Sequence, residues 1–451
     1  MKVLLLKPCW PYPISPEEST YNRIWPPLTL AYSAGLLEQD GIDATVLDAH
    51  AERLSGPRLA ARLRGFDKIF ITSSDVDRWL CPNLNLTPVV EAARLAAAHC
   101  PEIYLMGQHG TVDPDRMLQL TGATAVIRGE PEFAVRELCV AGQLDTVPGI
   151  SYRLEGTTVS TAPRPLLPLD RLPIPAWHRL PLARYHYELL GERFMLLETA
   201  RGCPFRCTFC AKDVMYGPGV RRRPLARVLT EIETAVTRAG VRTLYFYDLE
   251  FLLDQRYVES LCEALIARRY PLRWCCQTRV TDVREPLLAT MRQAGCRLIH
   301  FGVESGAPRV LRQIRKEATV ADAERAVRLT RQAGIETLCF FMLGFPGETA
   351  EERQATIRFA ERLNPTYVSF HVESPHEAVA PQADGTQRVL AFPPGDRSFD
   401  RTVKQEVRQA LRRFYLRPAF LWCRLQALGR GEWRLLGRQL QFFRRYLAAS
   451  T

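Results

Sequence analysis

The sequence has 451 residues, of which 47% are hydrophobic and 24% are charged. This composition is typical of globular proteins and excludes disordered and collagen-like chains. A single core rarely grows beyond about 300 residues, so we expect two or more domains. No apolar run reaches the ~20 residues of a membrane-spanning helix, and the apolar stretch at 3–6 is too short for a signal peptide. We therefore expect a cytoplasmic protein.

The net charge of +11 is concentrated in the last part of the chain. Residues 401–451 hold twelve lysines and arginines against two glutamates, a net charge of +10 that leaves about +1 for the rest. Aromatic residues alternate with these bases, for example in Arg412–Arg417 and Phe442–Tyr446. We expect helices that pack their aromatic side on the rest of the protein. The same pattern is compatible with contact to an anionic substrate or carrier, an anionic membrane surface or nucleic acid.

Residues 1–150 alternate short apolar runs with amphipathic segments. Strands are expected at 2–6, 44–47, 68–72, 102–106 and 125–127, and helices at 28–39, 57–64, 87–99, 114–121 and 130–141. This alternation predicts a doubly wound parallel sheet of the flavodoxin or Rossmann type, which binds ligands at the carboxyl ends of its strands. No G-x-G-x-x-G follows the first strand, so a dinucleotide ligand is not expected.

Residues 151–189 are predicted to form a hairpin and a linker, with six prolines between 162 and 182. A second alternation occupies 190–390. Its strands are expected at 194–199, 243–247, 273–278, 298–303, 337–343 and 367–372, and its helices at 224–239, 256–268, 285–294, 320–333 and 350–363. Six such units predict an open, partial (β/α) barrel with its chemistry at the strand C-termini. Residues 391–451 complete the α/β chain as a basic helical region.

Three of the thirteen cysteines are clustered. Cys203, Cys207 and Cys210 are spaced C-x-x-x-C-x-x-C on a loop that follows the first strand expected in the second alternation. Soft thiolate ligands suit an iron–sulfur cluster. With only three local ligands, one iron of a [4Fe-4S] cluster would stay open for a small molecule. A zinc site, which usually has four ligands, and three buried thiols remain as alternatives.

The segment Thr199–Cys210, with Phe209 before the last cysteine, resembles the cysteine loop of the radical S-adenosylmethionine enzymes. The resemblance implies that the cluster binds S-adenosylmethionine and cleaves it reductively to a 5′-deoxyadenosyl radical. It also implies an external one-electron reductant such as flavodoxin or ferredoxin.

Residues at four further strand ends agree with this resemblance, which implies that they contact S-adenosylmethionine. They are Asp248 and Glu250, Arg279, Glu304 within Phe301–Gly306, and Gly344 within Gly344–Glu348. Each has a plainer alternative. The two acidic residues of the first group could cap a helix, the arginine could lie at the surface, the glutamate could bind a neighbouring amide, and the glycine could serve only a tight turn.

The first domain resembles the cobalamin-binding domain fused to many radical enzymes, over the segments 26–32, 41–48, 106–111 and 127–132. The resemblance implies cobalamin contacts at Gly107, His109, Gly129 and Glu130. The D-x-H-x-x-G element that lends a histidine to cobalt in many cobalamin proteins is absent, so we expect no histidine ligand on the cobalt. Arg78 and Trp79 could lie beneath the corrin, or they could belong to an ordinary surface loop.

These resemblances predict a cobalamin-dependent radical S-adenosylmethionine methyltransferase, acting through a 5′-deoxyadenosyl radical and methylcobalamin. The expected acceptor is an unactivated carbon, or alternatively phosphorus, of a small molecule in natural-product biosynthesis. No catalytic residue is assigned, and no nucleic-acid partner is expected. The alternatives are a cobalamin-containing radical enzyme that rearranges or cyclises its substrate, a radical enzyme with an empty first domain, and a non-catalytic nucleic-acid-binding protein with a structural cluster.

Overall fold

The computed structural model describes residues 1–10, 24–74, 85–140, 143–373, 377–381, 387–391, 401–418 and 420. The predicted cobalamin contacts Arg78 and Trp79 lie outside the described residues. Among the helices that the structure describes, none combines the length and the apolar character needed to cross a membrane.

The first sheet has seven strands in the order β2-β1-β3-β4-β5-β6-β7. Five are parallel: β1 (Lys2–Lys7), β2 (Asp43–Asp48), β3 (Lys68–Thr72), β4 (Glu102–Met106) and β5 (Ala125–Ile127). Alternate residues of β1 enter two different cores, Val3 and Leu5 on one face and Leu4 and Leu6 on the other. Helices α1 (Leu28–Gln39) and α7 (Glu132–Val140) pack on the first face, and α4 (Thr87–Ala97) and α6 (Pro114–Thr121) on the second. The expected doubly wound parallel arrangement is present.

The hairpin that follows is part of this sheet. Strands β6 (Ile150–Leu154) and β7 (Thr157–Ser160) add antiparallel to β5, so the first sheet continues to Ser160. The polar turn between the two strands allowed the hairpin to be predicted. Nothing in its local sequence indicates which sheet edge the hairpin joins.

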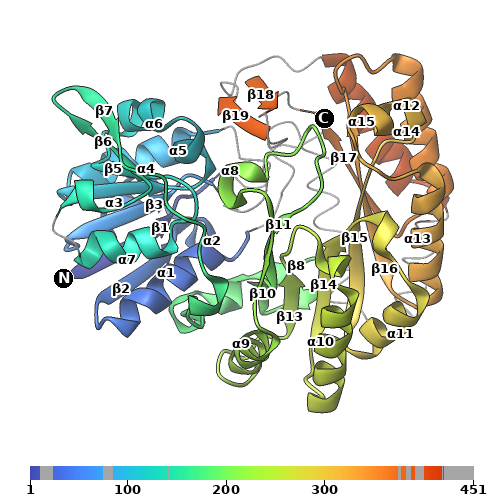
Figure 1. Ribbon diagram of the computed structural model, residues 1–451, viewed down its shortest axis with the longest axis horizontal. Coiled ribbons are helices and arrows are strands. Elements are labelled where there is room, and N and C mark those ends of the chain that lie inside the picture. The colour runs from blue at the N-terminus through green and yellow to red at the C-terminus, as the bar shows by residue number, and fades with distance from the viewer. Residues whose placement is uncertain are drawn as a thin grey trace.

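The second sheet contains six parallel strands in the order β10-β13-β14-β15-β16-β17 (Figure 1). Its strands are β10 (Phe194–Leu197), β13 (Thr243–Phe246), β14 (Arg273–Thr278), β15 (Cys296–Glu304), β16 (Glu336–Leu343) and β17 (Tyr367–Val372). Its helices are α9 (Leu225–Thr237), α10 (Gln255–Arg268), α11 (Glu285–Gln293), α13 (Val320–Gln332) and α14 (Ala350–Leu363). Gly240, Gly295 and Gly334 follow three of them with positive φ, as expected for glycines that end helices.

The remaining elements are short. The helices are α2 (Ala49–Glu52), α3 (Gly56–Ala60), α5 (Gln108–Val112), α8 (Asp213–Tyr216) and α12 (Pro308–Gln313), and the strands are β8 (His186–Tyr187), β9 (Gly191–Glu192), β11 (Ala200–Cys203), β12 (Gly219–Arg222), β18 (Glu377–Pro381) and β19 (Gln387–Ala391). Single 3-10 turns lie at Leu144–Thr146, Leu169–Arg171, Trp177–Arg179, Leu182–Arg184, Phe251–Leu253 and Val280–Asp282. Most of these elements are too short to give a periodic pattern in the sequence.

The basic C-terminal segment begins with α15 (Arg401–Tyr415), which packs on the second sheet beside its edge strand β17. Val407, Leu411 and Phe414 are buried on its inner side. The Tyr415 hydroxyl accepts from the backbone N–H of Val368 (3.1 Å) and donates to the carbonyl of the same residue (2.5 Å). These bonds occupy an edge of β17 that would otherwise be open. The expected aromatic packing is confirmed for this helix, and residues 421–451 lie outside the described part of the chain.

Candidate functional site

The cysteine loop is held by a small hairpin rather than following β10 directly. Strand β11 pairs antiparallel with β12, and Cys203 lies opposite Gly219. Gly202 has a φ of 91°, and a Cβ on it would lie 2.2 Å from the carbonyl oxygen of Gly219. Only glycine fits there. The hairpin therefore fixes where the loop with Cys207 and Cys210 begins and ends.

The donor set of this loop fits an iron–sulfur cluster. Burial raises the pKa of Cys203 to about 11 and that of Cys210 well above its usual value, so both thiols are protonated without a metal. They must lose these protons when a metal binds, because the thiolate is the ligand. The Arg279 guanidinium lies 3.6 Å from the Cys207 sulfur, and such a cation stabilises thiolate charge. Among the described residues, no three or more His, Cys, Asp or Glu side chains are grouped closely enough to hold one metal ion, whereas a structural zinc site has four such ligands. In a cubane, by contrast, each cysteine binds a different iron.

Asp248 and Glu250, after β13, are both buried and both bound within the site. Asp248 accepts from the backbone N–H groups of Thr199 (2.6 Å) and Ala200 (3.2 Å), which fixes the turn between β10 and β11. Glu250 accepts from the Thr278 hydroxyl and the Arg279 backbone N–H, and burial raises its pKa to about 8. The alternative of helix capping is wrong, because Glu250 precedes the 3-10 turn Phe251–Leu253 without a capping hydrogen bond from its side chain, and Asp254 caps α10.

Arg279, at the end of β14, is 4% exposed, so the surface alternative is also wrong. Its guanidinium stacks on Phe205 of the cysteine loop, 3.8 Å from the ring centroid, and also bonds the carbonyl of Lys316. The arginine therefore joins the loop to the second sheet.

Glu304 ends β15 at a bulge and has a φ of 69°, a backbone conformation that costs energy for a residue with a side chain. Its carboxylate pairs with the Lys316 ammonium at 2.8 Å, rather than with a neighbouring amide. A Cβ on Gly302 would lie 2.7 Å from that ammonium nitrogen, so the glycine leaves room for the pair. Burial alone would lower the pKa of Lys316, but Glu304 and Cys207 raise it.

Phe209 packs on Phe345, with 5.8 Å between ring centroids, in the turn after β16. Gly344 in this turn has a φ of 91°. The Glu348 carboxylate accepts from the backbone N–H groups of Gly344 (2.6 Å) and Phe345 (3.2 Å), which closes the turn. The structure thus brings the end of β16 against the cysteine loop.

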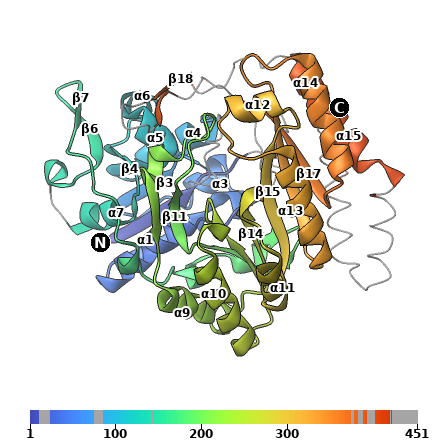
Figure 2. The same ribbon diagram turned by 45° about the vertical axis from the view of Figure 1, so that its right-hand side comes forward.

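The predicted cobalamin contacts lie at the carboxyl edge of the first sheet. Gly107, with a φ of 111°, precedes α5 after β4, and Gly129, with a φ of 76°, follows β5. His109 is buried, and its Nδ1 lies 3.3 Å from the Ser73 hydroxyl beyond β3. This edge faces the cysteine loop, because α5 packs on α8, which follows the three cysteines. Figure 1 shows α8 and β11 between the two sheets, and in Figure 2 β11 is drawn over the first sheet.

Glu130 belongs to an ion-pair network between the first sheet and the cysteine hairpin. Arg201 of β11 is 2% exposed and binds Glu130 at 2.9 Å, Glu132 at 2.7 Å and Glu198 at 2.8 Å. Arg221 of β12 binds Glu130 at 2.7 Å. Burial alone would raise the pKa of Glu130, but the two guanidinium groups lower it to about 2. The network ties the segment after β5 to a residue two positions before Cys203.

Glu198, Arg201 and Lys316 were not predicted as residues of the site, and Glu348 was named only as the end of the Gly344–Glu348 segment. Lys316 follows a helix rather than a strand, and its partner Glu304 is twelve residues away. Arg201 could have been noticed beside the cysteine motif, but its partners are about seventy residues earlier in the chain.

The fold and the cysteine loop together define an enzyme of the radical SAM type, and residues 197–360 match the model of the Radical SAM superfamily. The chain belongs to this superfamily. It is 30% identical to an uncharacterized methyltransferase of Pyrococcus horikoshii over 388 residues, which cover 83% of this chain and 81% of the relative.

Two further proteins resemble this chain, one in sequence and one in fold. The chain is 31% identical to the anaerobic magnesium-protoporphyrin IX monomethyl ester cyclase of Rubrivivax gelatinosus, over 78% of this chain and 64% of that protein, slightly less than two thirds of its length. In fold it resembles the radical S-adenosylmethionine methyltransferase TsrM from Kitasatospora setae, solved with cobalamin and a [4Fe-4S] cluster, with a TM-score of 0.64 and 20% identity over 82% of this chain and 72% of that chain.

Proposed function

We propose that this protein is a cobalamin-dependent radical S-adenosylmethionine methyltransferase that acts on a small molecule. The observation that carries the proposal is the juxtaposition of the cysteine hairpin with the carboxyl edge of the first sheet, through α5, α8 and the Arg201 network. Doubly wound sheets bind ligands at that edge. The strand order around β1 is that of a flavodoxin-like sheet. Residues 1–150 would then form the cobalamin domain, which the β6–β7 hairpin extends to Ser160. The rest of 151–189 would be the linker, 190–390 an open (β/α) barrel, and 391–451 the basic helical region.

Cys203, Cys207 and Cys210 would hold the [4Fe-4S] cluster. When bound, the cluster supplies the electron that cleaves S-adenosylmethionine, and cobalamin supplies methyl transfer. Both reactions depend on how the protein positions these cofactors.

Some residues of the site would bind S-adenosylmethionine, and others would position the residues that bind it. Glu250, Glu304 and Gly344 would contact S-adenosylmethionine, with Phe209 against the turn that carries Gly344. Asp248 would act indirectly, because its carboxylate fixes the turn that leads into β11.

On the first sheet, Gly107, Gly129 and His109 would line the cobalamin edge. Glu130 would instead hold the interface, since its carboxylate pairs with two arginines and accepts the backbone N–H of Leu167 at 2.9 Å.

The test needs no substrate. Anaerobically reconstituted protein is incubated with reduced cobalamin and S-adenosylmethionine carrying a deuterated methyl group, and then separately with a low-potential reductant. We expect the label on cobalamin with release of S-adenosylhomocysteine in the first reaction, and 5′-deoxyadenosine in the second.

The similarity to the cyclase favours one rival, a cobalamin-containing radical enzyme that cyclises its substrate. That enzyme would release 5′-deoxyadenosine without moving the label, and this result would overturn the methyltransferase proposal.

A further inference from the structure

Strand β17 ends beside the S-adenosylmethionine side of the site in residues that the proposed function does not use. The backbone N–H of Glu373 donates to the Leu343 carbonyl at 2.8 Å, so the ladder between β16 and β17 continues one residue beyond the strand. Because side chains alternate along a strand, Glu373 lies on the same face as Ser369 and His371.

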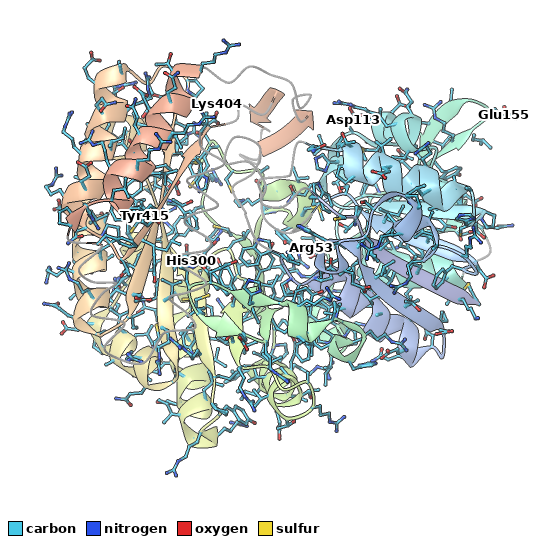
Figure 3. The ribbon with its side chains drawn as sticks, turned by 180° about the vertical axis from the view of Figure 1, so that it is seen from behind. Arg53, Asp113, Glu155, His300, Lys404 and Tyr415 are labelled. Carbon is cyan, nitrogen blue, oxygen red and sulfur yellow. The ribbon has the colours of Figure 1, made fainter. Side chains whose placement is uncertain are left out.

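This face is the one that the helices do not cover. On β16, Phe341 contacts Phe359 of α14, whereas its neighbour Phe340 contacts His300 and His371 (5.7 and 5.8 Å between ring centroids). His300, labelled in Figure 3, therefore marks the inner face. Gly302, Phe340, Met342, Ser369 and His371 on this face are only half-buried, while their outward neighbours are buried under the helices. Several residues of the inner face of β15–β17 are therefore partly exposed to solvent.

Glu373 directly follows β17, and its described neighbours leave one carboxylate oxygen without a hydrogen-bond partner. Glu348, after β16, also has one such oxygen, but its other oxygen closes the turn with Gly344 and Phe345. Glu373 is 8% exposed, and its Oε2 receives no hydrogen bond in the described part of the chain. A buried carboxylate costs free energy unless a cation or hydrogen-bond donors compensate it. Burial raises its pKa to about 7, and no charged side chain among the described residues offsets this effect.

The groups around Glu373 do not supply the missing charge. Burial lowers the pKa of His371 to about 4, so the imidazole is neutral at physiological pH, and its Nε2 lies 2.9 Å from the Ser369 hydroxyl. Phe340 presents an aromatic ring on the same face, one strand away. Phe340 is opposite Ser369 in the ladder, four residues before the level of Glu373, and its ring contacts His371 rather than the carboxylate. An ammonium group on a ligand would supply the cation that the carboxylate lacks.

From this arrangement we infer that the inner face of β16 and β17 binds a substrate bearing a protonated amine, with Glu373 as the residue that pairs with the ammonium group. The inference rests on the proposed function, because it names the substrate class of that site. The amine would be held one strand beyond the turn with Gly344, so that the rest of the substrate extends towards the cysteine loop.

The experiment compares two probes of similar shape, phenethylamine, which is protonated at pH 7, and 2-phenylethanol, which is neutral. Their dissociation constants are measured by ligand-observed NMR on the reconstituted full-length protein with S-adenosylmethionine. We expect the wild-type protein to bind the amine at least about tenfold more tightly than the alcohol, which corresponds to about 1.4 kcal/mol.

In Glu373→Gln we expect that preference to disappear, with binding of the alcohol unchanged. Glu361→Gln is the matched control, because Glu361 pairs with Arg413 on the outer side, and it should keep the wild-type preference. The inference is overturned if the wild-type protein shows no preference for the amine, or if Glu373→Gln retains it. Iron content and methyl transfer to cobalamin, measured on the same samples, report separately on the proposed function.

Discussion

Replacing Arg201 by Met tests whether the buried network holds the cysteine hairpin to the first sheet. The substitution keeps much of the apolar stem but leaves Glu130, Glu132 and Glu198 without a shared guanidinium. Lowering the pKa of Glu130 from 4.5 to about 2 corresponds to about 3 kcal/mol. Removing one partner of a buried ion pair typically costs about 3–5 kcal/mol. Arg221 retains part of the interaction with Glu130, so we expect a loss near 3 kcal/mol.

The assay is thermal unfolding of the full-length protein, with iron content measured after anaerobic reconstitution. A loss near 3 kcal/mol lowers Tm by at least about 6 °C for units of this size, and we expect less iron because Arg201 is two residues before Cys203. Arg136→Met is the control, since the Arg136 guanidinium donates two hydrogen bonds to the Asp40 carboxylate at the surface, at 2.5 and 2.6 Å. Exposed pairs contribute at most about 1 kcal/mol. Equal losses of Tm in the two variants would refute the role of the network.

Three further predictions follow from single contacts. Lys316→Met leaves the Glu304 carboxylate buried without its cation, so we expect binding of S-adenosylmethionine to weaken at least about 30-fold by titration calorimetry, and unchanged affinity would contradict this. Tyr415→Phe removes both bonds to Val368, so hydrogen exchange at that amide should accelerate and stability should fall by about 1–2 kcal/mol, whereas wild-type exchange would show that the hydroxyl does not protect β17. Glu130 has a lower pKa in the folded than in the unfolded chain, so its stabilisation is complete above pH 4.5 and disappears as the pH falls towards 2; the Tm difference between the wild type and Glu130→Gln should shrink over that interval, and a constant difference would be inconsistent with the pairing.

The regular part of the fold could be predicted because local patterns determine it. The range of α1 (Leu28–Gln39) and that of β14 (Arg273–Thr278) were predicted to the residue, since Pro27 and Gly41 bound the helix and the centre of the strand, 274–276, is apolar and buried. The strand ends that carry Glu250 and Arg279 followed from the same reasoning. The cysteine hairpin did not, because β11 and β12 are four residues each and are separated by the loop itself.

What the sequence could not give were the contacts between distant segments. Arg201 reads as an ordinary residue of the cysteine motif until the fold brings Glu130 and Glu132 against it. Glu373 follows a strand in the sequence, but only the register of β16 and β17 shows which face it occupies. Ion pairs between the two sheets depend on how the sheets pack, and no local sequence pattern predicts that packing.

The most direct test of the account is the EPR spectrum of the anaerobically reconstituted, reduced protein, recorded with and without S-adenosylmethionine and accompanied by iron and sulfide analysis. We predict one [4Fe-4S] cluster per chain, a spectrum that changes when S-adenosylmethionine binds, and no cluster when Cys203, Cys207 and Cys210 are all replaced by Ala. A cluster that persists in the triple variant, or a spectrum indifferent to S-adenosylmethionine, would contradict the central claim that this loop is the radical-generating site.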